Sequence, residues 1–138
     1  MNHTAQTSPF FPAWVTTHLD DLDRAAAALE RGDLRALGER MEHNTLKMHA
    51  TTLSADPPFW YFNATTLAVM DAVRVLRAAG YDAWFTMDAG PHVKVLCPAA
   101  QATDIASACA AVPGVVGIDI ARSGGPARLI GLDDVVEQ

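Results

Sequence analysis

The sequence predicts an α+β fold in which a helical hairpin precedes an antiparallel sheet with helices on one face. Apolar residues recur every three or four positions through the first third of the chain, which is the period of an amphipathic helix. From residue 59 onward, short apolar or β-branched runs alternate with helical patterns in the order strand, helix, strand, strand, helix, strand. This βαββαβ order is the split βαβ arrangement of ferredoxin-like domains.

Length and composition indicate one domain over residues 1–138, with the hairpin at about 13–54 and the sheet part at about 57–132. Half of the 138 residues are hydrophobic, which is enough for a single core. The net charge of -6 and the lack of a basic run argue against a nucleic-acid partner. Because no long apolar stretch or signal sequence is present, we expect a cytoplasmic protein that binds no membrane. Cys97 and Cys109 are expected to be reduced core thiols.

Two helices joined by a short turn form the predicted hairpin. The first spans Ala13–Arg31, Gly32 ends it, and Asp33 is placed to cap the second helix, which spans Leu34–Leu53. Asp20, Asp21, Asp23 and Arg24 are expected on the solvent face of the first helix. Its buried face is expected to consist of Val15, Leu19, Leu22, Ala26 and Leu29.

Prolines 57 and 58 stop the second helix, since proline cannot continue a helix and restricts the residue before it. Helices are then predicted from 3.6-residue periodicity and strands from β-branched or aromatic runs between turn residues. In chain order these elements are a strand at Phe59–Phe62, a helix at Asn63–Ala79, strands at Trp84–Met87 and Val93–Cys97, a helix at Ala99–Val112, and strands at Val115–Ala121 and Arg128–Leu132.

The sequence offers weak candidates for metal or nucleophilic chemistry. Glu39 and His43 lie four apart on a helix, but six further residues rotate His49 away from that face, so no three-ligand site is expected. A solvated helix face is the favoured interpretation. Gly124 and Gly125 follow a strand but precede no helix, which favours a structural turn over a phosphate site. The remaining histidines lack an evident nucleophile partner: His3, His18 and His92.

Asp88 is the strongest candidate because it lies where a predicted strand breaks into a loop. Loops at strand ends present functional groups on a stiff scaffold. Period-two alternation places Trp84, Thr86 and Asp88 on one side of the strand, so the carboxylate is expected to be partly desolvated, as suits a general base. The alternative is an acid that only hydrogen-bonds the turn formed by Ala89, Gly90 and Pro91.

Four separated motifs together resemble the C-terminal half of diphosphomevalonate decarboxylase, a member of the GHMP kinase superfamily. They are Thr7–Phe11, Lys47–Thr51, Pro57–Phe59 and Phe85–Pro91, in the right order and at matching spacing. The likeness extends from about Thr7 to Leu132. It implies the C-terminal domain of a GHMP-type enzyme.

The resemblance also implies a reaction. Members of this family use ATP and a magnesium ion to phosphorylate the tertiary hydroxyl of mevalonate 5-diphosphate, then lose phosphate and carbon dioxide to give isopentenyl diphosphate. The essential acid of the family's Met-Asp-Ala-Gly-Pro motif matches Asp88. The family's ATP loop and phosphate-binding cations belong to an N-terminal GHMP domain absent from this sequence. We therefore expect the chain alone to bind neither ATP nor a metal and to be inactive without that domain.

One departure from the family pattern and two alternatives remain open. His92 stands where family members usually have Asn. The first alternative is a different substrate, mevalonate 5-phosphate or another mevalonate phosphate. The second is that the chain is not catalytic but a ferredoxin-like interaction module, and such a module could form a homodimer. His49, Thr51 and Lys94 lie in matching motifs, and we expect them to serve core packing or to support the turn.

Overall fold

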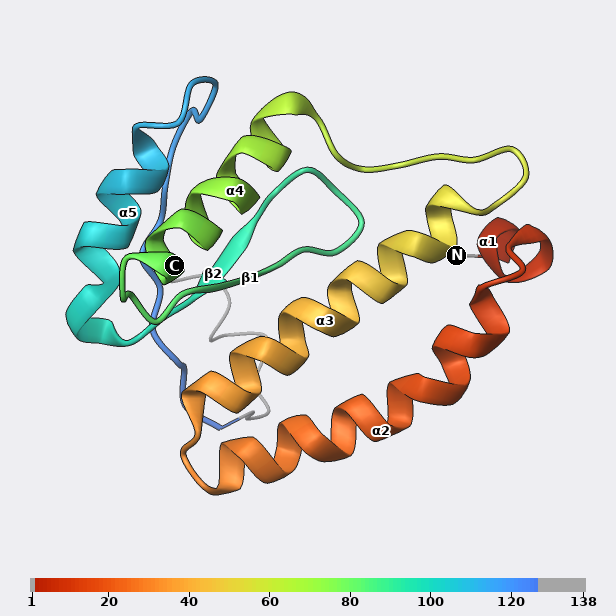
Figure 1. Cartoon of the computed structure of the whole chain (residues 1–138), viewed down its shortest axis with the longest axis horizontal. Coiled ribbons are helices and arrows are strands. Elements are labelled where there is room, and N and C mark those ends of the chain that lie inside the picture. The colour runs from red at the N-terminus through yellow and green to blue at the C-terminus, as the bar shows by residue number, and fades with distance from the viewer. Residues whose placement is uncertain (1, 127–138) are drawn as a thin grey trace, which may run out of the picture.

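The computed structural model describes residues 2–126 and contains both helices and a small antiparallel sheet, so the α+β class is confirmed. The hairpin of strands lies between α3 and α4 (Figure 1). None of the described helices is long and apolar enough to cross a membrane. The elements in order are α1 Asn2–Thr7, α2 Phe11–Glu30, α3 Leu34–Leu53, α4 Ala64–Ala78, β1 Trp84–Thr86, β2 Lys94–Leu96, a 3-10 turn at Ala99–Gln101 and α5 Ala102–Ala110.

Local capping sets several helix ends where the sequence predicts them. Gly32 adopts a φ of 64° after α2, and the Asp33 carboxylate accepts a hydrogen bond from the Ala36 amide at 3.0 Å to cap α3. Asn63 caps α4 by accepting from the Thr66 amide, and the Thr66 hydroxyl accepts from the Asn63 amide in return. The short helix α1 was not predicted, because its polar sequence carries no apolar period.

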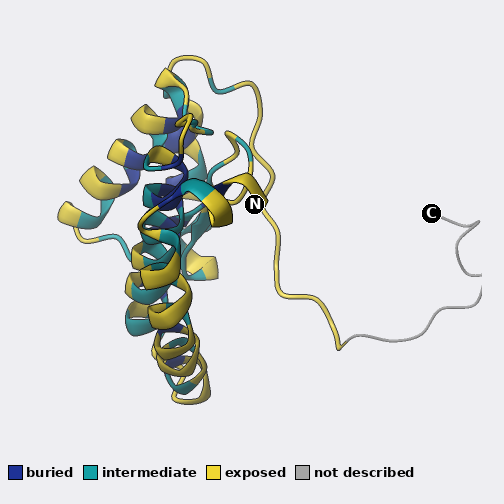
Figure 2. Cartoon of the chain, turned by 90° about the vertical axis from the view of Figure 1, so that its right-hand side faces the viewer, coloured by how far each residue is buried: buried dark blue, intermediate teal, exposed yellow. Residues whose placement is uncertain are grey.

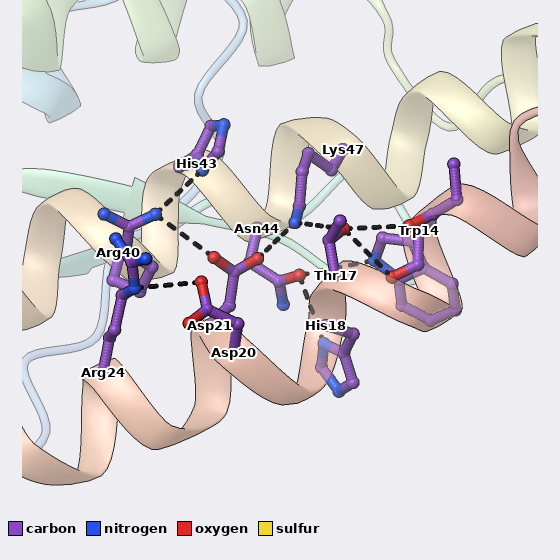
Figure 3. Close-up of polar contacts among 11 residues, drawn as sticks. Trp14, Thr17, His18, Asp20, Asp21, Arg24, Arg40, His43, Asn44 and Lys47 are labelled. Carbon is purple, nitrogen blue, oxygen red and sulfur yellow. Dashed lines mark hydrogen bonds and ion pairs between the residues drawn. The ribbon is translucent and has the colours of Figure 1, made fainter.

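The predicted orientation of α2 is wrong. Asp21, expected in solvent, is only 4% exposed and faces α3, where it pairs with Arg40 and Lys47 (Figure 3). Burial disfavours the charged carboxylate, but the hydrogen bonds and charges of Lys47 and Arg40 outweigh it and lower the pKa of Asp21. The apolar residues expected in the core are exposed instead, up to 68% for Leu29. This apolar stripe of α2 consists of Val15, Leu19, Leu22, Ala26 and Leu29.

Polar side chains explain why α2 turns this face toward α3. The Asn44 carbonyl oxygen lies 3.3 Å from Trp14 Nε1, which donates to it, and 3.2 Å from His18 Nδ1. Lys47 also donates to the Thr17 hydroxyl at 2.7 Å. Because buried polar groups must be paired, these contacts fix the rotation of α2 (Figure 3). The apolar stripe is left facing away from α3.

The sheet of the described residues has two strands, so the four-strand ferredoxin-like order is not confirmed. β1 and β2 are antiparallel with Thr86 opposite Lys94. The strand predicted at Phe59–Phe62 is wrong, because this extended segment has no neighbouring strand and packs aromatic rings against the core. The strand predicted at Val115–Ala121 is also wrong: the chain after residue 115 leaves the helical body as an exposed stretch (Figure 2). Arg128–Leu132 lies outside the described residues.

The core joins both faces of the β-hairpin to the helices. Trp84 is buried against α3, where its ring lies over Gly38, and Phe85 is buried among residues of α4 and α5. An aromatic ring can lie this close to a helix only where the helix has no side chain. The buried members of the main cluster are Met70, Val73, Ala83, Phe85, Met87, Ile105 and Cys109.

Replacing Gly38 by Ala is expected to destabilise the chain. A Cβ atom at this position would lie 2.2 Å from Trp84 Cδ2, and the fully buried ring has no room to move aside. Overpacking of this kind costs about 1–3 kcal/mol of the free energy of unfolding, which urea unfolding would measure. Gly117→Ala is the matched control, since nothing lies within 4 Å of its added Cβ. Equal stability of both variants would contradict the close Trp84 contact.

Candidate active site

Asp88 is the first exposed residue after β1, and the turn that follows it is ordered by hydrogen bonds. The Gly90 amide donates to the Asp88 carbonyl at 2.9 Å, and the Thr66 hydroxyl donates to the Pro91 carbonyl at 3.1 Å. The Asp88 side chain is 83% exposed, so the expected partial desolvation is wrong for this chain. Its carboxylate Oδ2 lies 2.6 Å from Lys94 Nζ. The acid is therefore presented to solvent from an anchored turn.

Side chains of α3 hold the edge of β1 that does not pair with β2. The Thr45 hydroxyl accepts from the Met87 amide at 3.2 Å and donates to the Met87 carbonyl at 2.6 Å. Glu42 Oε2 accepts from the Phe85 amide at 3.2 Å. Alternate amides of a strand point to the same side, so α3 takes the place of a neighbouring strand. Met87, the residue before Asp88, is thus held by hydrogen bonds at both its amide and its carbonyl.

Sequence reasoning did not single out Thr45. A signal did exist: Thr45 lies four residues after Met41 and four before His49 on α3, so the three share one face of the helix. A hydroxyl on the buried face of a helix indicates a specific hydrogen-bond partner. Nothing in the sequence identifies that partner as Met87, because the two residues are 42 positions apart.

An ion pair between Glu42 and Arg77 ties α3 to α4 beneath the same strand. Arg77 donates from Nη1 and Nη2 to the two Glu42 carboxylate oxygens, each at 2.9 Å, and also to the Ala83 carbonyl at 3.0 Å. The hydrogen bonds that Arg77 donates to Glu42 raise the pKa of the guanidinium. This bidentate geometry makes the pair both strong and directional.

His49 lies behind the Met87–Asp88 segment. It is 1% exposed and packs against Tyr61 and Phe62, with ring centroids 5.9 and 4.8 Å away. Burial lowers the pKa of the imidazole, while the Met87 backbone and the Asp88 charge act in the opposite direction. Thr51, from the same motif, is also buried, and its hydroxyl donates to the Met48 carbonyl within α3.

The other sequence candidates do not gather around Asp88. Glu39 and His43 line a cavity of about 270 Å³ together with Glu42, Leu46, Arg77 and Trp84, and Asp88 does not line it. Among residues 2–126, no group of three or more His, Cys, Asp or Glu is placed to hold a metal ion. Both cysteines are unbridged, and burial raises the pKa of each thiol. The other histidines lie apart: His3 near the Pro57 carbonyl, His18 against Asn44, and His92 exposed.

The model of one protein family, described as the mevalonate 5-diphosphate decarboxylase C-terminal domain, matches residues 1–117 of the chain. The chain belongs to this family. The resemblance seen in its separated motifs is thereby confirmed. Within the family match lie the β1–β2 turn with Asp88 and the α3 residues that hold it.

Relatives of this decarboxylase family cover most of the chain. The phosphomevalonate decarboxylase of Haloferax volcanii is 30% identical over 127 residues, which make up 91% of this chain and 39% of the relative. The Staphylococcus aureus mevalonate diphosphate decarboxylase is 42% identical, with a TM-score of 0.74 over 77% of this chain and 32% of that one.

The solved enzyme from Enterococcus faecalis, whose mevalonate diphosphate mediated ATP binding was studied, is 40% identical, with a TM-score of 0.75 over 78% of this chain and 33% of that one. A further similar structure, described as MDDEF in complex with MVAPP, AMPPCP and magnesium, is 40% identical. Its TM-score is 0.76 over 78% of this chain and 33% of that one. The chain therefore spans well under half the length of these relatives.

Proposed function

We propose that the chain is the C-terminal, substrate-side domain of an ATP-dependent decarboxylase acting on mevalonate 5-diphosphate, with Asp88 as the acid at the reacting hydroxyl. The family match and the identity to solved mevalonate diphosphate decarboxylases support this function. The single observation that carries the role of Asp88 is its geometry: an exposed carboxylate directly follows a residue held at both its amide and its carbonyl.

The proposed role of Asp88 follows from the chemistry of the substrate. A tertiary alcohol is a poor nucleophile, and a fixed carboxylate can orient it and accept its proton as the phosphoryl group arrives. Phosphorylation turns the hydroxyl into a leaving group, so the existing carbon–oxygen bond can break with release of phosphate. Loss of carbon dioxide supplies the electron pair of the new double bond, which gives isopentenyl diphosphate without a carbanion-stabilising cofactor. Lys94 pairs with Asp88 in the free chain, so it neutralises the carboxylate before an anionic substrate approaches.

The described residues do not by themselves suit a magnesium nucleotide. Two polyphosphates need several cations, whereas the ammonium group next to Asp88 is that of Lys94, the first residue of β2, and it is already paired with Asp88. No cluster of metal-ligating side chains forms in residues 2–126. We infer that ATP and magnesium, which supply and activate the phosphoryl group, are held by an N-terminal domain, and that this chain contributes the proton acceptor.

A second substrate is favoured by one specific observation. The relative from Haloferax volcanii, 30% identical over nearly the whole chain, is a phosphomevalonate decarboxylase. Mevalonate 5-phosphate has the same tertiary hydroxyl and carboxylate, so the proposed role of Asp88 would be unchanged. The two substrates differ in one phosphate group, which is not part of the tertiary alcohol on which Asp88 is proposed to act.

The experiment is to join the N-terminal region of the Staphylococcus aureus enzyme to this chain and to assay ATP-dependent release of carbon dioxide. We expect the fusion to turn over, the isolated chain to be inactive, and kcat/KM to distinguish mevalonate 5-diphosphate from mevalonate 5-phosphate. A folded fusion that is inactive with both substrates would instead support the non-catalytic interaction module.

A further inference from the structure

Two buried threonine hydroxyls hold the two ends of the turn that carries Asp88. Thr45 on α3 is 5% exposed, and Thr66 in the first turn of α4 is 2% exposed. Thr45 accepts from the Met87 amide at 3.2 Å and donates to the Met87 carbonyl at 2.6 Å, just before the acid. Thr66 donates to the Pro91 carbonyl at 3.1 Å, at the other end of the turn. The turn is therefore joined to a different helix at each end.

The Thr45 contact is not the usual hydrogen bond of a threonine in a helix. Such a hydroxyl commonly donates to a carbonyl three or four residues earlier in the same helix. Thr51 and Thr52, which are also buried on α3, bond in this way at 2.7 and 2.9 Å. Thr45 instead binds the Met87 backbone, 42 positions away in the sequence. Formation of α3 alone does not require this contact.

The Thr66 hydroxyl has one proton, and the neighbouring groups favour its donation to Pro91. Asn63 Oδ1 also lies 3.0 Å from this hydroxyl, but it already accepts from the Thr66 amide at 2.8 Å. The Pro91 carbonyl has no other donor among the described residues. The hydroxyl oxygen meanwhile accepts from the Asn63 amide at 3.2 Å, which completes the cap of α4. The cap of α4 and the end of the turn thus form one hydrogen-bonded unit.

We propose that Thr45 and Thr66 are positioning residues, whose hydroxyls together fix where the Asp88 carboxylate emerges from the turn. The turn is short, and the Gly90 amide donates to the Asp88 carbonyl at 2.9 Å within it. Release of either end therefore lets the acid move, and a small displacement of a catalytic group lowers the rate of reaction. The catalytic part of this inference rests on the proposed function of Asp88, whereas the ordering of the turn does not.

Valine and serine substitutions separate the hydroxyl from the shape of the side chain. Thr45→Val and Thr66→Val keep the branched shape and lose the hydrogen bonds, whereas Thr45→Ser and Thr66→Ser keep the hydroxyl. Thr52→Val is the matched control on α3, because the buried Thr52 hydroxyl bonds only within its own helix. Thr65→Val is the matched control on α4, because the Thr65 hydroxyl donates to the Pro113 carbonyl at 3.4 Å.

Amide exchange in the chain itself tests the ordering of the turn. We expect Thr45→Val to raise the exchange rate of the Met87 amide about fivefold, the effect of losing one ordinary hydrogen bond. Thr66→Val should raise that of Gly90 by a similar factor, because the bond from Gly90 to Asp88 lies inside the turn that Thr66 holds. The serine variants and both controls should match the unmodified chain. Unchanged rates in the valine variants, or an equal rise in the controls, would overturn the proposal.

The unmodified chain offers a measurement that does not depend on whether a variant folds. The Met87 amide donates to the Thr45 hydroxyl, so it should exchange more slowly than the same amide in an unstructured peptide. A Met87 amide that exchanges as fast as in such a peptide would overturn the proposal.

The fusion described above tests the catalytic part. Thr45→Val and Thr66→Val should each lower kcat about tenfold or more with little change in KM, because the acid is displaced while the other substrate contacts remain. The serine variants should recover most of that loss, and Thr52→Val should keep the kcat of the unmodified fusion. An equal loss of kcat in Thr45→Val and Thr52→Val would show a purely structural role and overturn the proposal. If the unmodified fusion is inactive, the proposed function fails, and amide exchange still decides whether the two hydroxyls order the turn.

Discussion

Replacing Asp88 by Asn in the active fusion is expected to lower kcat by about 10²–10⁴-fold, the usual contribution of a positioned general base. The side-chain amide of the introduced Asn keeps the shape of the Asp88 side chain but cannot accept the proton of the tertiary hydroxyl. Stability should change little, because the side chain is 83% exposed and an exposed ion pair such as Asp88–Lys94 contributes about 0–1 kcal/mol. Steady-state assay of carbon dioxide release and urea unfolding measure the two effects.

Asp82→Asn is the matched control for Asp88→Asn. Asp82 also flanks β1, on the N-terminal side, and it also makes a surface ion pair, with Arg35 at 2.9 Å. Loss of a carboxylate there should leave kcat within about twofold, since it lies at the opposite end of the strand. Full activity of Asp88→Asn, or an equal loss in both variants, would remove Asp88 from the proposed mechanism.

Features that depend on neighbouring residues in the sequence were predictable. The Asp33 cap and the ends of α3 follow from short-range rules, and the structure places them as predicted. A helix is also predicted to begin at Asn63, and the structure shows that this residue caps α4. The turn after Asp88 is of the same kind, because Gly90 and Pro91 restrict the backbone within a few residues. The exposure of the Asp88 side chain was not predictable in this way, since it depends on whether distant segments cover the turn.

The orientation of α2 shows why a helical period does not identify the buried face. The apolar stripe predicts which residues share a side, but the choice of partner belongs to α3, whose Arg40, Asn44 and Lys47 require polar contacts. Asp21 satisfies two of these groups at once, so the polar face of α2 is turned inward. Any prediction that treats apolar and buried as equivalent fails at this interface.

The sheet was overpredicted for a related reason. A β-branched or aromatic run at Phe59–Phe62 or Val115–Ala121 favours extended backbone, yet a strand also needs a neighbour with which to share its hydrogen bonds. β1 receives part of that pairing from Glu42 and Thr45 instead of a strand. These contacts join residues more than 40 positions apart, and no local pattern encodes them.

Glu42→Ala is expected to lower the free energy of unfolding by about 3 kcal/mol, the low end of the range for breaking a buried ion pair. The substitution leaves the mostly buried Arg77 guanidinium with only the Ala83 carbonyl, and it removes the acceptor of the Phe85 amide. One side chain joins α3, α4 and β1, so its loss should loosen all three together. Urea unfolding of the chain measures this as a lower midpoint with an unchanged slope.

Glu39→Ala separates the role of the Glu42 contacts from the removal of a charge. Glu39 precedes Glu42 by three residues on α3 and lines the same cavity, but it is exposed and makes no hydrogen bond among the described residues. Its loss should change the free energy of unfolding by less than about 0.5 kcal/mol. A double-mutant cycle that combines Glu42→Ala with Arg77→Met gives the coupling energy of the Glu42–Arg77 pair directly. Equal effects of Glu39→Ala and Glu42→Ala would show that net charge, not the bridge to Arg77 and β1, stabilises this part of the fold.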